Sequence, residues 1–198
     1  MISTMMDRQQ IFDSLHEECG VFGAFNVPDA ASITYYALHS LQHRGQEGCG
    51  IVTFDGETMH REKGLGLVTE VFSKEKLEHL PGTVAIGHVR YSTAGGGGLD
   101  NVQPFTGNFA LAHNGNIVNS EQLRRYLEAN GSLFHSTSDS EILAHLIKKN
   151  NHEAQRIDAI IEALNMIEGA FAFLIMTPRR IYACRDKYGL RPLSLGRL

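Results

Sequence analysis

Two short connections constrain the fold of this chain most, because each predicts a β-hairpin. Asp55-Gly56 follows the strand-like run 49–54, and Asp-Gly between two strand-like runs is a strong signal for a two-residue turn. Pro178-Arg179-Arg180 separates the wholly apolar run 170–176 from a second strand-like run, 181–184. Local antiparallel pairs of this kind, with helical patterns between them, predict a layered α+β domain.

Helical spacing of apolar residues occupies much of the chain between these hairpins. The buried face expected for a helix over 30–42 consists of Ile33, Tyr36, Ala37 and Leu41. The buried face expected for the last helix consists of Ile157, Ile160, Ile161 and Leu164. Asn119 and Ser138 each have a glutamine or glutamate three residues later, which predicts a capping box at the start of two more helices. A weaker helical pattern covers 71–80.

Two further runs predict buried strands, and polar residues follow both. Residues 83–89 are nearly all apolar or small and run into Arg90. Residues 109–112 are followed by His113-Asn114-Gly115-Asn116, which we expect to form a turn. The consecutive glycines Gly95 to Gly98 predict a mobile flap. A phosphate-binding loop is the rejected alternative, because the Lys-Ser/Thr pair that should follow it is missing.

The composition is typical of a soluble globular domain, with 42% hydrophobic residues and a net charge of −4 over 198 residues. This charge does not indicate a nucleic acid or an anionic membrane as a partner, and no apolar run could span a bilayer. Residues 1–18 lack the basic start and apolar centre of a secretion signal, so we expect a cytoplasmic protein. The three cysteines include no CxxC pair, which argues against a disulfide framework and a zinc site. His39 and His43 lack the glutamate of the zinc-protease motif, so we expect no metal here.

Cys19 stands between the acidic pair Glu17-Glu18 and an alternating run of small and apolar residues. One interpretation is a buried thiol at the start of a core strand, since cysteine is often buried. The other is a nucleophile. Removal of residues 1–18 would make Cys19 the N-terminus, and its α-amine, with a usual pKa of about 7.7–8.0, could accept the thiol proton. The residues alone leave both interpretations open.

Several polar residues near the ends of predicted elements could form a site for a free amino acid. Arg90 could bind a carboxylate through two hydrogen bonds, and Asp139 could hold an ammonium group. Asn114 and the amide of Gly115 could donate to a developing oxyanion. Each has a structural alternative: a surface ion pair for Arg90, a favourable helix-start charge for Asp139, and a tight turn for Asn114-Gly115.

Five separated motifs resemble those of the class II glutamine amidotransferases and occur in the family order. They are Cys19-Gly20-Val21-Phe22-Gly23, Leu41-Gln42-His43-Arg44-Gly45-Gln46-Glu47, Gly87-His88-Val89-Arg90-Tyr91-Ser92-Thr93-Ala94-Gly95, Leu111-Ala112-His113-Asn114-Gly115-Asn116 and Thr137-Ser138-Asp139-Ser140-Glu141. Residues 186–192 also match, so the resemblance covers essentially 19–198. Gln46-Glu47 and the run 90–93 favour the members that act on phosphoribosyl pyrophosphate in de novo purine synthesis. The glucosamine-phosphate synthases and asparagine synthetases differ there.

The resemblance implies a four-layer αββα fold of the N-terminal-nucleophile hydrolase type, with two antiparallel sheets between helices. It also implies hydrolysis of L-glutamine through a thioester. The implied roles are nucleophile for Cys19, oxyanion donors for Asn114 and Gly115, carboxylate binding for Arg90, ammonium binding for Asp139, flap closure for Thr93 and support near the nucleophile for Arg44.

The resemblance further implies a leader at 1–18, removed by self-processing, and a glutamine amidotransferase domain at 19–198. Because the chain ends at Leu198 inside a predicted strand, we expect this domain to be incomplete and a phosphoribosyltransferase domain to be missing. Phosphoribosyl pyrophosphate, Mg²⁺ and, in one subtype, a 4Fe–4S cluster would belong to that missing part. The segment itself needs no cofactor, and the whole enzyme is expected to be a homotetramer. Cys49 and Cys184 do not match cluster ligands and are expected to be core thiols.

Two alternatives remain at this stage. A related glutaminase could serve a different ammonia acceptor. A non-catalytic module of the same fold could bind an amino acid through Arg90 and Asp139 without ever exposing Cys19 as an N-terminus.

Overall fold

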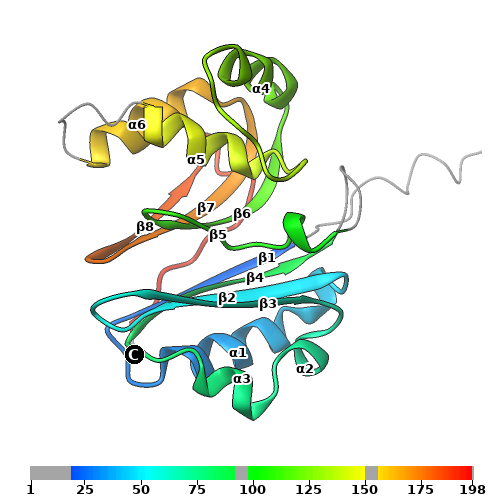
Figure 1. The fold of residues 1–198 in the computed structure, drawn as a ribbon, viewed down its shortest axis with the longest axis vertical. Coiled ribbons are helices and arrows are strands. Elements are labelled where there is room, and N and C mark those ends of the chain that lie inside the picture. Colours follow the sequence, from blue (N-terminus) through cyan, green and yellow to red (C-terminus); the bar gives the residue numbers. More distant parts are fainter. Residues whose placement is uncertain (1–18, 92–97, 150–155, 198) are drawn as a thin grey trace, which may run out of the picture.

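The structure, a computed structural model, describes residues 19–91, 98–149 and 156–197. They form four layers, in which two four-stranded antiparallel sheets face each other and helices cover the outer face of each sheet (Figure 1). The expected α+β class and αββα arrangement are therefore confirmed. The predicted leader and most of the predicted flap, including Thr93, lie outside the described residues.

The first sheet has the strand order β1-β4-β2-β3. Its strands are β1 (Gly20–Phe25), β2 (Gly48–Phe54), β3 (Met59–Leu65) and β4 (Val84–Arg90). The hairpin predicted at Asp55-Gly56 joins β2 to β3, but the expected two-residue turn is wrong: Phe54 pairs with Met59, so the connection has the four residues 55–58. β1 is antiparallel to β4, with Gly20 opposite Val89, so Cys19 lies beside the last residues of β4.

The second sheet has the strand order β5-β6-β7-β8. Its strands are β5 (Phe105–Thr106), β6 (Ala110–Ile117), β7 (Gly169–Thr177) and β8 (Arg180–Arg185). The second predicted hairpin joins β7 to β8. The turn expected at 113–116 is wrong, because these residues continue β6, which pairs with β7 as far as Ile117 opposite Gly169. Pairing with a long apolar neighbour overrides the local turn preference of Asn and Gly.

Helices form the two outer layers. Beside the first sheet lie α1 (Ala30–Ser40), α2 (Val68–Val71) and α3 (Lys74–Glu78), and beside the second lie α4 (Ser120–Ala129), α5 (Ser140–Lys149) and α6 (Arg156–Met166). Short 3₁₀ helices, η2 (Gln42–Arg44) and η3 (Leu99–Asn101), follow α1 and precede β5. The single helix expected over 71–80 is thus two shorter helices, α2 and α3.

The buried face of α1 differs from the expected one. It consists of Ala30, Ala31, Thr34 and Leu38. Tyr36, expected inside, is 68% exposed. A Cβ on Gly87 of β4 would lie only 2.6 Å from Cγ2 of Thr34, so small residues bring this helix close to the sheet. The close approach at Gly87, rather than the size of the apolar residues, selects the buried face.

The expected buried face of the last helix is confirmed only in part, since Ile160 is buried and Leu164 packs against the core. In α6 the buried residues are Ala159, Ile160 and Ala163. Ile157 and Ile161, both expected inside, are 39% and 49% exposed. Two of the three buried residues are alanines, and α6 packs against α5.

Neither predicted capping box forms, although the Ser138 hydroxyl accepts the Ser140 N–H over 3.3 Å. Asn119 makes no cap bond to α4; its side chain donates to the Met166 carbonyl and accepts from the Glu168 N–H. The Glu141 carboxylate accepts the N–H groups of His135 and Ser136, not that of Ser138. Both contacts fix loops that lead into the second sheet or α5.

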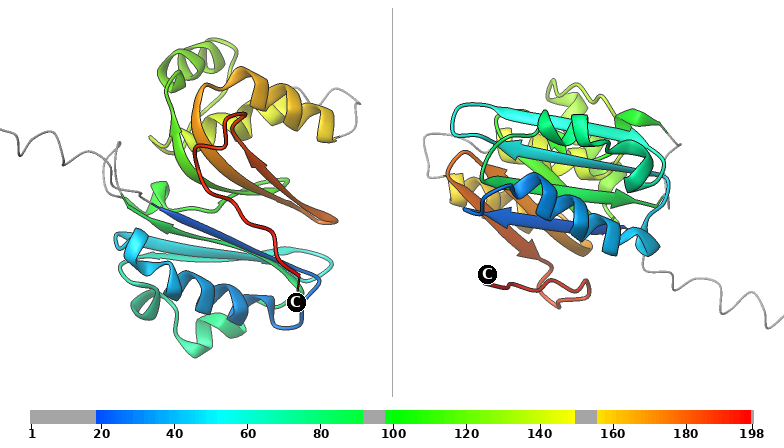
Figure 2. Two further views of the ribbon diagram at one scale, coloured as in Figure 1. Left: turned by 180° about the vertical axis from the view of Figure 1, so that it is seen from behind. Right: turned by 90° about the horizontal axis from the view of Figure 1, so that it is seen from below.

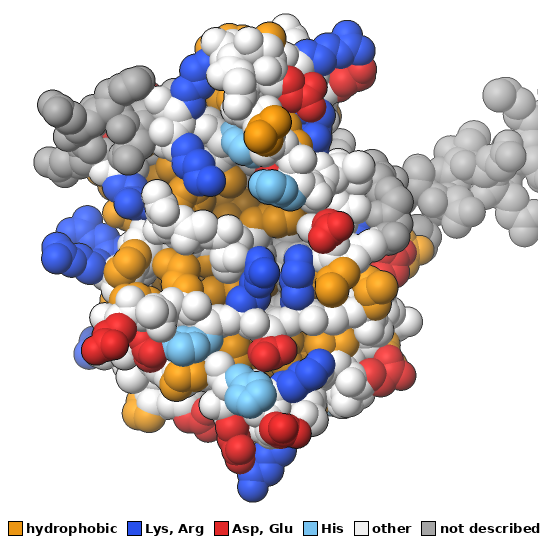
Figure 3. All heavy atoms as spheres, in the orientation of Figure 1, with side chains coloured by type: hydrophobic (Ala, Val, Ile, Leu, Met, Phe, Trp, Pro, Cys, Tyr) orange, Lys and Arg blue, Asp and Glu red, His pale blue; other side chains and the backbone are white. Residues whose placement is uncertain are grey.

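Apolar side chains fill the space between the sheets. They come from four strands and comprise Val52, Phe54, Val84, Ile86, Ala110, Ala112, Leu174 and Met176. Residues 193–197 run past the edges of β1 and β8 without forming a strand, so the strand expected there is wrong (Figure 2). On the face seen in Figure 3, acidic and basic side chains are interspersed over the layer of α1–α3. Within the described ranges, the helices are too short or too polar to cross a membrane.

Candidate active site

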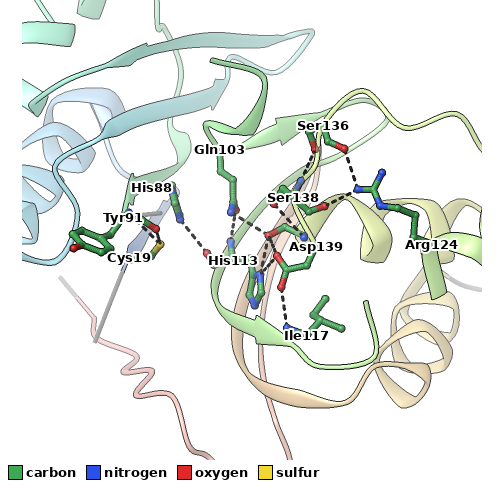
Figure 4. Close-up of polar contacts among 11 residues, drawn as sticks. Cys19, His88, Tyr91, Gln103, His113, Ile117, Arg124, Ser136, Ser138 and Asp139 are labelled. Atoms are coloured by element: carbon green, nitrogen blue, oxygen red, sulfur yellow. Dashed lines mark hydrogen bonds and ion pairs between the residues drawn. The ribbon is translucent and has the colours of Figure 1, made fainter. Parts of the chain in front are cut away.

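Cys19 directly precedes β1, and its thiol lies against Tyr91 at the end of β4 (Figure 4). The Tyr91 N–H donates to the sulfur over 3.4 Å, and the thiol is 3.4 Å from the Tyr91 carbonyl oxygen. Cys19 is partly exposed and has φ 71°, in the left-handed region that non-glycine residues seldom adopt. The sulfur is therefore accessible, and its backbone holds an uncommon conformation.

Arg44 fixes the backbone of Cys19 from both sides. The Cys19 N–H donates to the Arg44 carbonyl over 2.9 Å, and the Arg44 Nε donates to the Cys19 carbonyl over 2.9 Å. Arg44 ends the short helix η2, which follows α1 directly. Arg44 thus anchors the residue on which the candidate nucleophile stands.

Arg90 is the last residue of β4 and adjoins Tyr91, the residue that contacts the Cys19 thiol. Its side chain is only 8% exposed, and its Nη1 lies 3.4 Å from the Glu47 carboxylate. Gly45 allows the chain before Glu47 to approach, because a Cβ at this position would lie 2.7 Å from the Arg90 carbonyl carbon. A buried guanidinium, held by Glu47, therefore stands one residue before the backbone that contacts the Cys19 thiol.

Asn114 and Gly115 lie within β6. Asn114 is buried, and its Oδ1 has no hydrogen-bond partner among the described residues. Gly115 has φ 142°, and a Cβ there would lie 2.1 Å from the Ala170 carbonyl oxygen. Only glycine satisfies both conditions, so the backbone here has a specific shape rather than that of a flexible turn.

Asp139 stands immediately before α5, where its carboxylate is held from two sides (Figure 4). The Ile117 N–H donates to Oδ2 over 2.8 Å, and the Ser140 hydroxyl donates to Oδ1 over 3.3 Å. The side chain is 23% exposed. An oriented and partly accessible carboxylate is suited to binding a cation.

Buried polar residues connect these groups across the two sheets (Figure 4). His88 of β4 places its Nε2 3.0 Å from the His113 carbonyl of β6. Gln103 accepts the His113 N–H over 2.7 Å and donates to the Ser140 hydroxyl over 3.1 Å. His88, His113 and Ser140 lie within the motifs that carry the family resemblance, whereas Gln103 lies in none of them.

Burial keeps both histidines neutral. It lowers the pKa of His88 to about 3 and that of His113 to about 4, and nearby Asp139 offsets part of the effect on His113. The carbonyl of His113 can only accept, so the His88 Nε2 carries the proton of that ring. The two rings therefore act as neutral hydrogen-bonding groups at physiological pH.

These lowered pKa values predict an acid-sensitive fold. The unfolded chain gains protons below the ordinary histidine pKa of about 6.5, while the folded chain does not until about pH 4 or 3. Stability is therefore complete above about pH 6.5 and falls as the pH decreases, by at most about 1.4 kcal/mol per pH unit for each histidine. Urea unfolding of the parent chain and of His88→Asn at pH 7 and 5 will test this.

The variant should lose less stability between the two pH values than the parent chain, because one of the two titrating rings is gone. His39→Asn, at an exposed position of α1, is the matched control and should show the parent's decline. An equal decline in His88→Asn would contradict a neutral, buried His88.

Of the two other cysteines, Cys49 is a core thiol, as expected, and Cys184 is only partly buried. Burial raises the pKa of Cys49 to about 12 and that of Cys184 to about 11. Cys49 lies in the core under α1 and α2, and Cys184 packs against the core of the second layer. Across the described ranges, no group of three or more His, Cys, Asp or Glu side chains is arranged to hold a metal ion.

Comparison with known proteins identifies the family. Residues 89–198 match the family described as "Glutamine amidotransferase domain". An amidophosphoribosyltransferase of Bacillus subtilis (strain 168) is 55% identical over 188 residues, which are 92% of this chain and 39% of that protein. An amidophosphoribosyltransferase of Lacticaseibacillus casei is 50% identical, with 92% of this chain and 96% of that protein covered.

Solved structures agree with this relationship. The glutamine phosphoribosylpyrophosphate amidotransferase from B. subtilis, complexed with ADP and GMP, superposes with a TM-score of 0.84 at 52% identity, covering 90% of this chain and 39% of that chain. A structure described as the allosteric regulatory enzyme of purine biosynthesis gives a TM-score of 0.83 at 53% identity, covering 87% of this chain and 38% of that chain. The chain thus spans about two fifths of the B. subtilis relative. It has the N-terminal-nucleophile hydrolase fold, carries a glutamine amidotransferase domain and belongs to the amidophosphoribosyltransferase family.

Proposed function

We propose that this domain hydrolyses glutamine to glutamate and ammonia through a thioester on Cys19. The observation that carries the proposal is the setting of Cys19, whose backbone N–H donates to the Arg44 carbonyl while its sulfur faces the Tyr91 N–H. Removal of the leader 1–18 would convert that N–H into an α-amine already oriented beside its own thiol. The amine would accept the thiol proton and leave a thiolate nucleophile.

Substrate binding uses two charged side chains, one at the end of β4 and one immediately before α5. Arg90 binds the α-carboxylate and Asp139 the α-ammonium group, so that the side-chain amide of glutamine faces Cys19. Thr93 belongs to the flap that closes over the substrate, and Arg44 supports the nucleophile. A free amino acid carries both charges, so the pair selects glutamine over amides that lack either one.

The chemistry then proceeds in two acyl-transfer steps. The thiolate attacks the side-chain amide carbon, and the resulting oxyanion accepts hydrogen bonds from the Asn114 side chain and the Gly115 N–H. The amide C–N bond breaks, the nitrogen takes the proton that the α-amine of Cys19 had accepted from the thiol, and ammonia leaves and restores the neutral amine. Water, deprotonated by the same amine, attacks the thioester and releases glutamate.

In the whole protein, we propose that the ammonia displaces pyrophosphate from phosphoribosyl pyrophosphate and forms 5-phosphoribosylamine for purine synthesis. The names of the relatives support this acceptor. Mg²⁺ and, in a leader-bearing subtype, a 4Fe–4S cluster would belong to the phosphoribosyltransferase part, and no step above involves them. We further propose a cytoplasmic homotetramer, and a domain that extends from residue 19 through residue 198.

The intact mass of the purified chain, followed by a glutaminase assay, tests this proposal. We expect a mass lacking residues 1–18, and release of equal amounts of glutamate and ammonia from glutamine but not from asparagine. Glutamine binding without turnover, in a chain whose N-terminus is Cys19, would contradict the proposal and favour a non-catalytic module.

A further inference from the structure

The Ser140 hydroxyl is a junction of three side chains, although nothing in the proposed reaction uses it. Gln103 Nε2 donates to it over 3.1 Å, His113 Nδ1 lies 2.8 Å from it, and Asp139 Oδ1 is 3.3 Å away (Figure 4). Ser140 is 1% exposed. A buried hydroxyl with this many partners has a fixed orientation, because its single proton can be donated to only one of them.

The tautomer of His113 decides where that proton goes. His113 Nε2 is buried and has no hydrogen-bond partner among the described residues. A buried N–H without an acceptor is rarer in proteins than a buried acceptor without a donor, so the ring proton lies on Nδ1. His113 Nδ1 therefore donates to Ser140 Oγ, and the Ser140 proton is left for Asp139 Oδ1.

Two hydrogen-bond donors, a backbone N–H of β6 and a side-chain hydroxyl of α5, thereby orient the Asp139 carboxylate. The Ile117 N–H of β6 holds Oδ2, and the Ser140 hydroxyl holds Oδ1. His113, which orients that hydroxyl, directly precedes Asn114 in β6. The same junction thus connects the carboxylate before α5 with the strand that carries the oxyanion donors.

We propose that Ser140 is a positioning residue for glutamine recognition: its hydroxyl orients the Asp139 carboxylate toward the substrate's α-ammonium group. The inference rests on the proposed role of Asp139 as the ammonium site. The segment 98–104 supports the arrangement, since it joins the loop before α5 at two points. One is Gln103 with Ser140, and the other is Asn101, whose Nδ2 donates to the Thr137 hydroxyl over 3.0 Å.

The test compares two substrates of the same chain. Glutaramate is glutamine without the α-amino group, so its hydrolysis does not depend on an ammonium site. We expect Ser140→Ala to lower kcat/KM for glutamine by about tenfold to a hundredfold, the effect of losing a hydrogen bond to a charged group, mainly through KM. kcat/KM for glutaramate should stay within about twofold of that of the parent chain, because none of its charged groups contacts Asp139.

Two variants complete the design. Ser138→Ala removes a nearby hydroxyl that accepts a hydrogen bond from the Ser140 N–H. This variant should keep the parent's preference for glutamine over glutaramate. Asp139→Asn should lose that preference if the proposed function is right.

An equal loss of kcat/KM with both amides in Ser140→Ala would make the residue merely structural and overturn the inference. The same holds if Ser140→Ala keeps the preference while Asp139→Asn loses it, an outcome that leaves the proposed function standing. Unchanged preference in Asp139→Asn would instead contradict the ammonium site itself.

Discussion

Replacement of Cys19 by alanine is expected to lower glutamate release from glutamine by more than about a thousandfold, as removal of a covalent nucleophile does in other acyl-transfer enzymes. The physical reason is that no second thiol can replace it. Burial raises the pKa of Cys49 to about 12 and that of Cys184 to about 11, so neither forms a thiolate near neutral pH. Release of glutamate and ammonia over time, measured against the parent chain, checks the prediction.

The matched control is Cys184→Ala, which removes a partly buried thiol of the second layer and should leave turnover within a few-fold of the parent. Intact mass provides an independent result. If the Cys19 thiol also cleaves the leader, Cys19→Ala should retain residues 1–18, whereas Cys184→Ala should lose them. Glutamate release by Cys19→Ala at the parent's rate would show that the nucleophile lies elsewhere.

Local signals predicted the strands well and the helix faces poorly. The hairpin at Asp55-Gly56 and the apolar run that became β7 were identifiable because a turn signal or a long apolar stretch leaves few alternatives. The buried faces of α1 and α6 were only partly right: Ile160 is buried, but Tyr36, Ile157 and Ile161 are exposed, and small residues occupy much of each buried face. Which face packs closely depends on the partner surface, such as Gly87, and a helix's own sequence does not contain that information.

The candidate site, too, could be predicted from the sequence only in part. Cys19, Arg90 and Asp139 could be proposed because their chemistry is specific and the motifs around them resemble a known class. The resemblance, not the turn chemistry, assigned Asn114 and Gly115, and the turn expected at 113–116 is in fact a continuous strand. Gln103 could not be identified, since its contact with Ser140 spans 37 positions, and the motif that contains Ser140 did not indicate this contact.

Replacement of Gly115 by alanine is expected to have the largest effect on stability. Its φ of 142° is unfavourable for a residue with a Cβ, and that Cβ would lie 2.1 Å from the Ala170 carbonyl oxygen and 2.8 Å from the Phe171 Cα. The contact atoms are backbone, so β6 and β7 must separate to relieve the overlap. We expect the free energy of unfolding to fall by about 3 kcal/mol or more, from backbone strain together with overpacking.

Gly131→Ala separates these two causes. Gly131 also has a positive φ, 86°, but a Cβ there would meet nothing within 4 Å. Gly131→Ala should lower the free energy of unfolding by only about 1–2 kcal/mol, the cost of the left-handed conformation.

Urea unfolding of both variants tests the difference in stability, and a glutaminase assay of the folded fraction tests the effect on turnover. Because the strand shift displaces the Gly115 N–H from the proposed oxyanion, Gly115→Ala should lose turnover and Gly131→Ala should keep it. Equal destabilisation of the two variants would show that the strands yield easily at Gly115, and that the fit between β6 and β7 does not fix the donor.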